Sequence, residues 1–254
     1  MIVFRYDKTF EGLLTVVFDA FFLKIFPDRL IGETDVEPLF TEREHAVTTD
    51  GGKSNRVWLG LERKLMPISC NMIRYVWLSE VPQSDELIFR YIRKIFESPV
   101  SIELNFADED VLEIRNLAKK VDKERLRLIQ FVRFQKAADD VYFAPVSPVH
   151  NALPLALNHF TDRFNSQKWV IYDLKRNYGY FYDQKTLTEM TLEDLTAFTE
   201  GKLNEDLMAT DEKLFQDMWK AYFKSMTIKE RINPKLHRQN LPVRYWKYLT
   251  EKQS

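Results

Sequence analysis

LRLIQFVRFQKAADDVYFAPVSPVHNALPLALNHFTDRFNSQKWVIYDLKRNYGYFYD, residues 126–183, is the stretch that decides the fold. Its first part, 128–136, is rich in β-branched and aromatic residues, as strands are. A polar break separates it from 141–146, where the same pattern resumes and ends at prolines, which cannot donate to a ladder of hydrogen bonds. These residues predict two neighbouring strands.

The second part of this stretch changes to a helical period. Apolar side chains recur on one helical face at Leu153, Ala156, Leu157, Phe160 and Phe164. We therefore expect a helix over 152–164, capped by Asn151 and with Pro154 in its first turn. Residues 169–174 and 178–182 then predict a hairpin. Together these elements form a ββαββ unit whose helix covers one face of the sheet.

The rest of the chain is mainly helical. Apolar spacings of three and four, punctuated by prolines, predict helices at 9–26, 56–65, 68–79, 85–96, 108–120, 191–200 and 210–224. The 210–224 helix is expected to bury a stripe made of Leu214, Phe215, Met218, Trp219, Tyr222 and Phe223. Residues 2–6 predict a short first strand.

The expected fold class is α+β, with a small antiparallel or mixed sheet built on the ββαββ unit, a largely helical N-terminal half and a helical C-terminus. Residues 1–125 are expected to form a mainly helical subdomain, with strand 2–6 as a candidate to join the sheet. Residues 126–254 are expected to form an α+β subdomain, and the two pack as one globular unit. A chain of 254 residues is long enough to bury a sizeable core.

Composition excludes several chemistries. The single cysteine, Cys70, cannot form an internal disulfide, an all-cysteine iron–sulfur cluster or a four-cysteine zinc site. The four histidines show no HExxH or HxH spacing, and the chain has no GxSxG motif. Gly52-Lys53-Ser54 lacks the upstream glycine of a phosphate-binding loop, because Val47 stands there. We therefore expect no metal and no cofactor.

The apolar helix from Thr9 to Phe26 is the segment most similar to a membrane anchor. Asp19 and Lys24 interrupt it, and it is too short to span a bilayer. The lone cysteine fits a reducing compartment. We expect a cytoplasmic protein with no membrane partner.

Polar side chains of the central unit are the first candidates for a binding surface. If the apolar residues beside them face the helix, alternation places Arg133 and Gln135 on the open face of the sheet. On the helix, His159 and Arg163 are four residues apart and lie side by side. The alternative is structural, with Arg133 paired to a nearby aspartate. Its candidate partners are Asp139, Asp140 and Asp173.

The C-terminal segment differs from the rest in charge. Between residues 220 and 252 there are nine cations and two carboxylates, a local net charge of +7 in a chain whose net charge is −1. The cations are Lys220, Lys224, Lys229, Arg231, Lys235, Arg238, Arg244, Lys247 and Lys252. With Tyr245, Trp246 and Tyr248 among them, they suit phosphates and unpaired bases. Alternatively, Trp246 and Tyr248 anchor the C-terminus in the core while the cations remain in water.

Six segments of the chain carry a family resemblance. They are YDKTFEGLLTVVFDAF, FVRFQ, YFAPVSP, LPLALNHFTDRF, WVIYDLKRNYGYFYD and RINPKLHRQNLPVRYWKYLTE. They resemble a bacterial family, a domain of unknown function associated with DNA metabolism or repair. Its members stand alone beside a radical-SAM protein or are fused to a domain of the uracil-DNA glycosylase superfamily. The resemblance implies DNA as a partner, with a radical-SAM protein and a uracil-DNA glycosylase-type enzyme as further partners.

Three hypotheses for function follow. The first is a DNA-binding accessory protein in repair that acts with a partner enzyme. The second is a DNA-processing enzyme, with His159, Asp162 or His237 as acid–base groups and Arg133 or Arg163 clamping phosphates. The third is a protein-interaction module that does not bind DNA. The candidate nucleic-acid-binding residues are Arg133, Gln135, His159, Arg163, Arg176, Lys229, Arg231, Lys235, His237, Arg238, Gln239, Arg244 and Tyr245.

Overall fold

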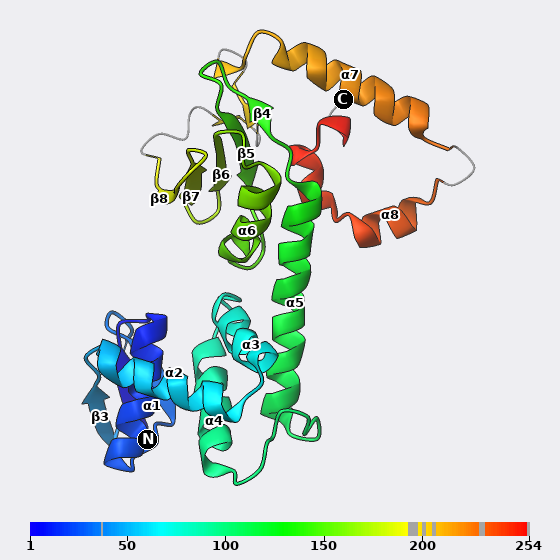
Figure 1. The fold of residues 1–254 in the computed structure, drawn as a ribbon. Coiled ribbons are helices and arrows are strands. Elements are labelled where there is room, and N and C mark those ends of the chain that lie inside the picture. The colour runs from blue at the N-terminus through cyan, green and yellow to red at the C-terminus, as the bar shows by residue number, and fades with distance from the viewer. Residues whose placement is uncertain (37, 193–197, 200–201, 205–206, 229–231, 253–254) are drawn as a thin grey trace. The chain divides into compact units, whose positions relative to one another are not determined.

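The computed structural model describes residues 1–36, 38–192, 198–199, 202–204, 207–228 and 232–252. The chain folds into two compact units, Met1–Asp122 and Lys123–Ser254 (Figure 1). The two units combine helices with small parallel and mixed sheets, so the predicted α+β class is confirmed.

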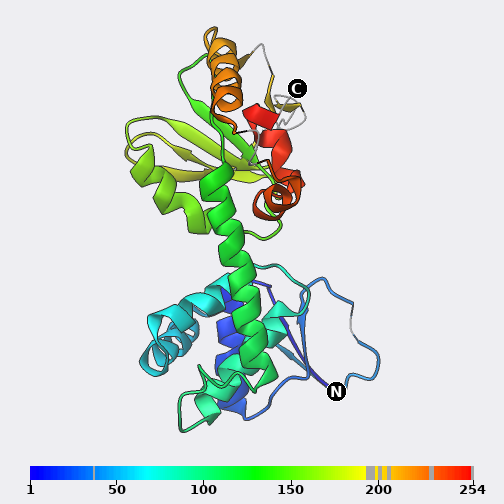
Figure 2. The same ribbon diagram turned by 90° about the vertical axis from the view of Figure 1, so that its right-hand side faces the viewer.

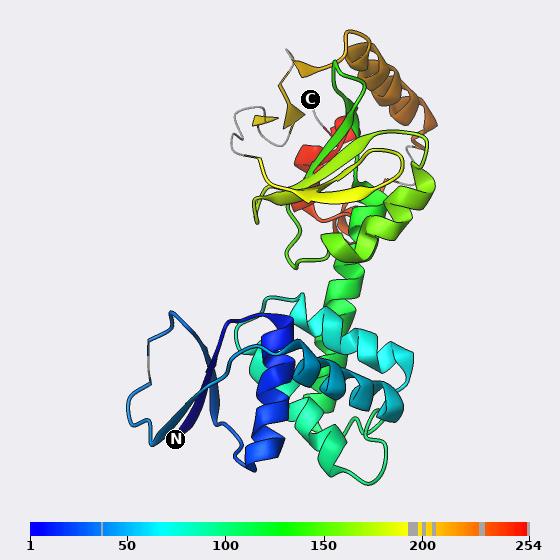
Figure 3. The ribbon, with the colours of Figure 1, turned by 60° about the vertical axis from the view of Figure 1, so that its left-hand side comes forward.

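The first unit begins with a small sheet of parallel strands (Figure 3). β1 (Ile2–Tyr6) lies between β2 (Arg29–Gly32) and β3 (Arg43–Ala46) and pairs with both in parallel. α1 (Phe10–Leu23) connects β1 to β2, and the Thr9 hydroxyl caps it by accepting the N–H of Gly12 at 2.9 Å. The predicted first strand is therefore confirmed, and the helix expected over 9–26 forms as α1.

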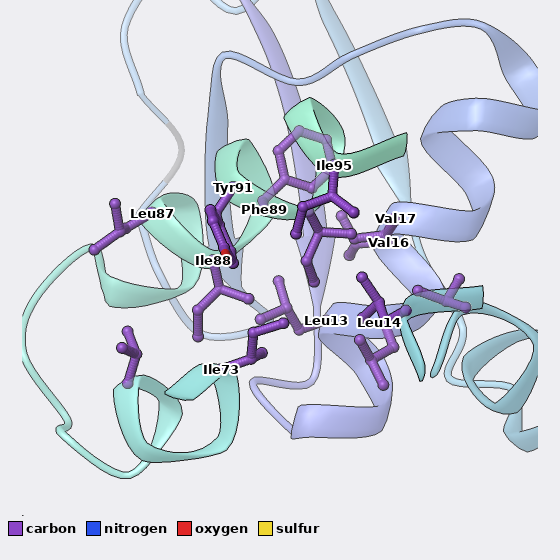
Figure 4. Packing of buried hydrophobic residues seen from close by; sticks show 14 of the residues in the cluster. Leu13, Leu14, Val16, Val17, Ile73, Leu87, Ile88, Phe89, Tyr91 and Ile95 are labelled. Carbon is purple, nitrogen blue, oxygen red and sulfur yellow. The ribbon is translucent and has the colours of Figure 1, made fainter. Parts of the chain in front are cut away.

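Further helices complete the first unit. They are α2 (Gly51–Lys64), α3 (Pro67–Trp77), α4 (Ser84–Glu97) and the start of α5 (Glu109–Phe131). Asp50 caps α2 by accepting the N–H of Lys53, so Gly52-Lys53-Ser54 forms the first turn of a helix. Apolar side chains of α1, α3 and α4 pack against one another in the core, including Leu13, Ile73 and Ile88 (Figure 4).

α5 overturns one prediction. It runs to Phe131, eleven residues beyond the expected end at 120, so the first part of the predicted strand 128–136 is helical and β4 covers only Gln135–Lys136. The helical period continues through Val121 to Leu128, and both side chains are fully buried. Burial on a helix face therefore outweighs the local strand propensity of these residues. Alternation along a strand cannot set the direction of Arg133, which lies outside any strand.

The second unit is built on a five-stranded mixed sheet in the order β4-β5-β6-β7-β8. Its further elements are β5 (Tyr142–Val146), α6 (Leu153–Arg163), β6 (Trp169–Asp173), β7 (Tyr178–Tyr182) and β8 (Leu187–Met190). β5 and β6 pair in parallel and the other neighbours pair antiparallel. α6 covers one face of this sheet (Figure 2). On that face the rings of Phe160 and Trp169 lie 6.2 Å apart. The predicted ββαββ order is confirmed, with its first strand shortened to β4 and β8 added at the edge.

Two local predictions in this unit are wrong. Asn151 does not cap α6. Its side-chain oxygen instead accepts the Tyr178 hydroxyl, and Ala152 is the cap residue. The helix expected over 191–200 is contradicted at Phe198–Thr199, which form β9 and pair with β10 (Lys202–Leu203). Residues 193–197 and 200 of that range lie outside the described residues.

The C-terminal segment consists of α7 (Glu212–Met226), α8 (Pro234–Asn240) and two 3-10 turns, η3 (Val243–Tyr248) and η4 (Thr250–Lys252). The helix predicted at 210–224 is confirmed by α7, but its predicted buried stripe is wrong. Every residue of that stripe is exposed, because the described part of the chain packs little against this helix.

Within the described residues, no helix combines the length and apolar character that crossing a bilayer requires.

Candidate nucleic-acid interface

Arg133 forms a structural ion pair. Its guanidinium donates to Glu251 at 2.9 Å and to the Gln130 carbonyl at 3.1 Å, instead of pairing with any of the three aspartates considered from the sequence. The indole N–H of Trp219 donates to the other oxygen of Glu251, also at 2.9 Å. Burial acts to raise the pKa of Glu251, but hydrogen bonds from its backbone, Trp219 and Arg133 lower it below the ordinary value. This carboxylate therefore ties α7 and the segment after α5 to η4.

Arg244 is also paired, through a nearly fully buried carboxylate on α5. Its guanidinium donates to Glu124 at 2.5 Å, and Arg127 donates to the same oxygen at 3.1 Å. The second oxygen of Glu124 accepts the N–H of Val149 at 2.8 Å. Burial favours a raised pKa for Glu124, yet these donors outweigh it and hold the pKa below its usual range. Arg244 of η3 therefore helps to hold the C-terminal turns against α5.

Two further candidate nucleic-acid-binding residues are packed into the second unit, near its five-stranded sheet. Arg176 donates to the buried Asp173 at 2.8 Å and to the carbonyls of Pro148 and Val149. Gln135 is buried in β4. Both side chains therefore stabilise the fold instead of facing solvent.

On α6, His159 and Arg163 are exposed and four residues apart, as predicted. The His159 ring contacts Phe160 edge to face, with centroids 5.4 Å apart. In the described part of the chain, Arg163 has no carboxylate partner.

The α8 candidates divide into exposed and packed side chains. Lys235, Arg238 and Gln239 are exposed, and the two cations have no carboxylate partner among the described residues. His237 stacks on Trp246 with centroids 5.6 Å apart. Burial and the nearby Lys252 lower the pKa of His237, which favours the neutral imidazole.

Tyr245 is buried against Phe131, Leu241 and Leu249. Burial raises the pKa of its hydroxyl, and the nearby Glu124 carboxylate raises it further. Tyr248 is buried too, and its hydroxyl donates to Ser147 at 2.7 Å. The predicted anchoring role is therefore confirmed for Tyr248. Trp246 is half-buried beside the same cluster.

Lys229 and Arg231, two candidates from the sequence, lie outside the described residues.

The candidate interface also includes aromatic side chains that were predicted from the sequence to be buried. Trp219, Tyr222 and Phe223 on α7 are exposed, and the rings of Trp219 and Tyr222 lie 5.7 Å apart. Their helix also carries Lys220 and Lys224, neither of which forms an ion pair with any described residue. A helical apolar stripe usually indicates a buried face, and only the fold shows that these side chains remain exposed.

Lys252 brings these elements together. Its ammonium lies 5.6 Å from the Phe223 ring of α7 and 5.5 Å from the Trp246 ring, which also stacks on His237. We call the resulting set the basic aromatic surface. It comprises Trp219, Lys220, Tyr222, Phe223 and Lys224 of α7, Lys235 and Arg238 of α8, and Trp246 and Lys252 of the 3-10 turns. Its chemistry combines unpaired cations with accessible rings.

Among the described residues, no three His, Cys, Asp or Glu side chains form a cluster that could hold a metal ion. His159 and His237 each contact an aromatic ring, and neither pairs with a carboxylate in that part of the chain.

Comparison with known proteins gives one family match. A comparison with curated proteins finds no match. Residues 82–251 match a domain of unknown function, DUF4130, a range that runs from just before α4 into η4 and covers well over half of the chain. The chain therefore belongs to the DUF4130 family, a domain of unknown function.

Proposed function

We propose that this protein is a DNA-binding accessory protein of DNA metabolism or repair that acts with a partner enzyme. One observation carries the proposal. On the basic aromatic surface, Lys220 and Lys224 of α7 and Lys235 and Arg238 of α8 have no carboxylate partner among the described residues, and the rings of Trp219, Tyr222 and Phe223 are exposed on α7.

These two features suit different parts of a nucleic acid. Cations that replace the counterions of phosphates supply affinity that does not depend on sequence. Exposed rings add stacking with unpaired bases, worth about 1–3 kcal/mol per base. Because the rings need accessible bases, the surface favours single-stranded DNA over duplex.

The paired arginines have a supporting role in this proposal. Arg133 and Arg244 are neutralised by Glu251 and Glu124, so they fix the C-terminal turns instead of contacting phosphates. Arg176 is neutralised in the same way by Asp173. The proposed interface therefore lies on α7, α8 and η4, and not on the open sheet face expected from the sequence.

The family resemblance supports the biological setting. The similar bacterial proteins, associated with DNA repair, stand beside a radical-SAM protein or are fused to a domain of the uracil-DNA glycosylase superfamily. An accessory DNA-binding chain fits either arrangement, since the chemistry would come from the partner.

The experiment is fluorescence anisotropy of labelled single-stranded and duplex DNA over a salt series. The double variant Lys235→Ala, Arg238→Ala should weaken single-strand binding and reduce the slope of log K against log salt by about 1.4, or 0.7 per lost phosphate contact. The matched control is Lys119→Ala, Lys120→Ala, which removes two exposed cations from the first unit. This control should leave both affinity and slope unchanged.

A slope that falls equally in both double variants would contradict the proposed interface. Absence of binding at low salt would contradict DNA binding altogether. That result would favour the third hypothesis from the sequence, a protein-interaction module. The exposed aliphatic side chains of α7 support this alternative. Leu214, Met218 and Met226 are each more than half exposed, and aliphatic groups suit a protein partner better than they suit bases.

A further inference from the structure

The first unit contains an open hollow of about 480 Å³ between α1, α2 and α4. α1 contributes Phe18, Phe21 and Phe22 to its lining, and α4 contributes Phe96. Small-molecule sites typically occupy roughly 300–1,000 Å³ and are lined by apolar and aromatic side chains with a few polar groups. The hollow has the size and the lining of such a site.

The rings around the hollow are fixed by mutual contacts. Phe21 and Phe96 meet edge to face with centroids 5.7 Å apart, and Phe18 stacks with Phe22 at 6.1 Å. Gly60 of α2 allows this arrangement, because a Cβ there would lie 3.1 Å from the Phe96 ring. Phe22 is 74% exposed, so an apolar ligand that covered it would remove aromatic surface from water.

One cation at the hollow is not neutralised by any described carboxylate. The Arg56 guanidinium lines it, lies 5.2 Å from the Phe18 ring and has no carboxylate partner among the described residues. The neighbouring Lys53 differs, because the buried Asp19 accepts from it at 2.8 Å. The hollow therefore combines aromatic walls with a single available guanidinium.

We propose that this hollow binds a small aromatic acid. Its ring lies against the phenylalanines, and its carboxylate pairs with Arg56. A guanidinium matches a carboxylate with two parallel hydrogen bonds, which a neutral analogue of the same shape cannot accept as well. This site lies in the first unit and does not depend on the proposed binding of DNA.

Isothermal titration calorimetry of the full chain tests the site, with 2-naphthoate and its neutral analogue 2-naphthalenemethanol as probes. The wild-type protein should bind 2-naphthoate about tenfold more tightly than the alcohol, the effect expected of one charged hydrogen-bonding partner. Arg56→Gln should abolish that difference, and Phe22→Ala should weaken both probes. Both substituted side chains are exposed, so the fold should be retained, which thermal unfolding checks.

Arg115→Gln is the matched control. Arg115 also lies over a phenylalanine, 4.2 Å from the ring of Phe106, but it does not line the hollow. Its substitution should leave the binding of both probes unchanged. Equal affinity for the acid and the alcohol in the wild type, no binding of 2-naphthoate, or the same loss in Arg115→Gln as in Arg56→Gln would each overturn the proposal.

Discussion

At the scale of single residues, Glu124 is a carboxylate on which several donors of the second unit converge. Its carboxylate is nearly fully buried and receives Arg127, Arg244 and the N–H of Val149. Replacing it with Gln removes the negative charge and leaves two guanidinium groups without their partner. Because breaking a buried pair costs about 3–5 kcal/mol, Glu124→Gln should lower the free energy of unfolding of this unit by about 3 kcal/mol.

Hydrogen exchange read by mass spectrometry over residues 142–173 measures this loss within the second unit alone. Glu113→Gln is the control, since Glu113 is exposed on the same helix. Its effect should stay within about 0.5 kcal/mol, as is usual for surface substitutions. Similar losses in the two variants would show that the ion pairs of Glu124 do not stabilise the unit.

The lowered pKa values of Glu124 and Glu251 predict a dependence on pH. Each folded-state pKa lies below the unfolded-state value near 4.5, so the unfolded chain binds more protons as the pH falls through this range. The stability that these groups contribute is fully present above about pH 5 and is lost towards lower pH. Urea titrations across this range should show a smaller acid loss in Glu124→Gln than in the wild type. An identical acid loss in both proteins would contradict the assignment.

At the scale of elements, α7 is the helix for which the structure differs most from the sequence prediction, because its predicted buried face is exposed. Its rings are exposed, so they contribute little to stability, whereas stacking on a base is worth about 1–3 kcal/mol. Tyr222→Ala should therefore weaken binding of single-stranded DNA about tenfold, with a smaller effect on duplex and none on thermal unfolding. Fluorescence anisotropy with both DNA forms provides the measurement.

Leu214→Ala is the matched change on the same helix, because Leu214 is similarly exposed but has no ring to stack. It should leave DNA affinity unchanged. If Leu214→Ala weakens DNA binding as much as Tyr222→Ala, the rings do not stack on bases and α7 contributes only an apolar surface.

At the scale of the whole molecule, local patterns predict the elements better than they predict the site. The two strand segments within 169–182 and the helical period in 152–164 are both local signals, and the hairpin and α6 formed where they indicated. The site depends on contacts between distant residues. Arg133 pairs with Glu251, 118 positions away, and Arg244 pairs with Glu124, 120 positions away. No spacing in the sequence predicts such pairs, so Arg133 and Arg244 were candidates for phosphate contacts although both are already neutralised.

Charge is also distributed unevenly over the whole chain. Residues 1–122 carry 16 cations and 21 carboxylates, whereas residues 123–254 carry 21 cations and 17 carboxylates. A polyanion should therefore be repelled weakly by the first unit and attracted by the second. This asymmetry predicts which residues bound DNA should protect from hydrogen exchange.

Hydrogen exchange of the full chain, with and without a single-stranded oligonucleotide, should show protection concentrated in residues 212–252. Residues 1–122 should exchange at unchanged rates, even though exposed cations such as Lys119 and Lys120 occur there. Raising the salt concentration should remove the protection, because bound phosphates are then replaced by free counterions. Protection that centres on His159 and Arg163 of α6 would instead place the DNA on the helix side of the sheet, and would move the binding residues to the central unit.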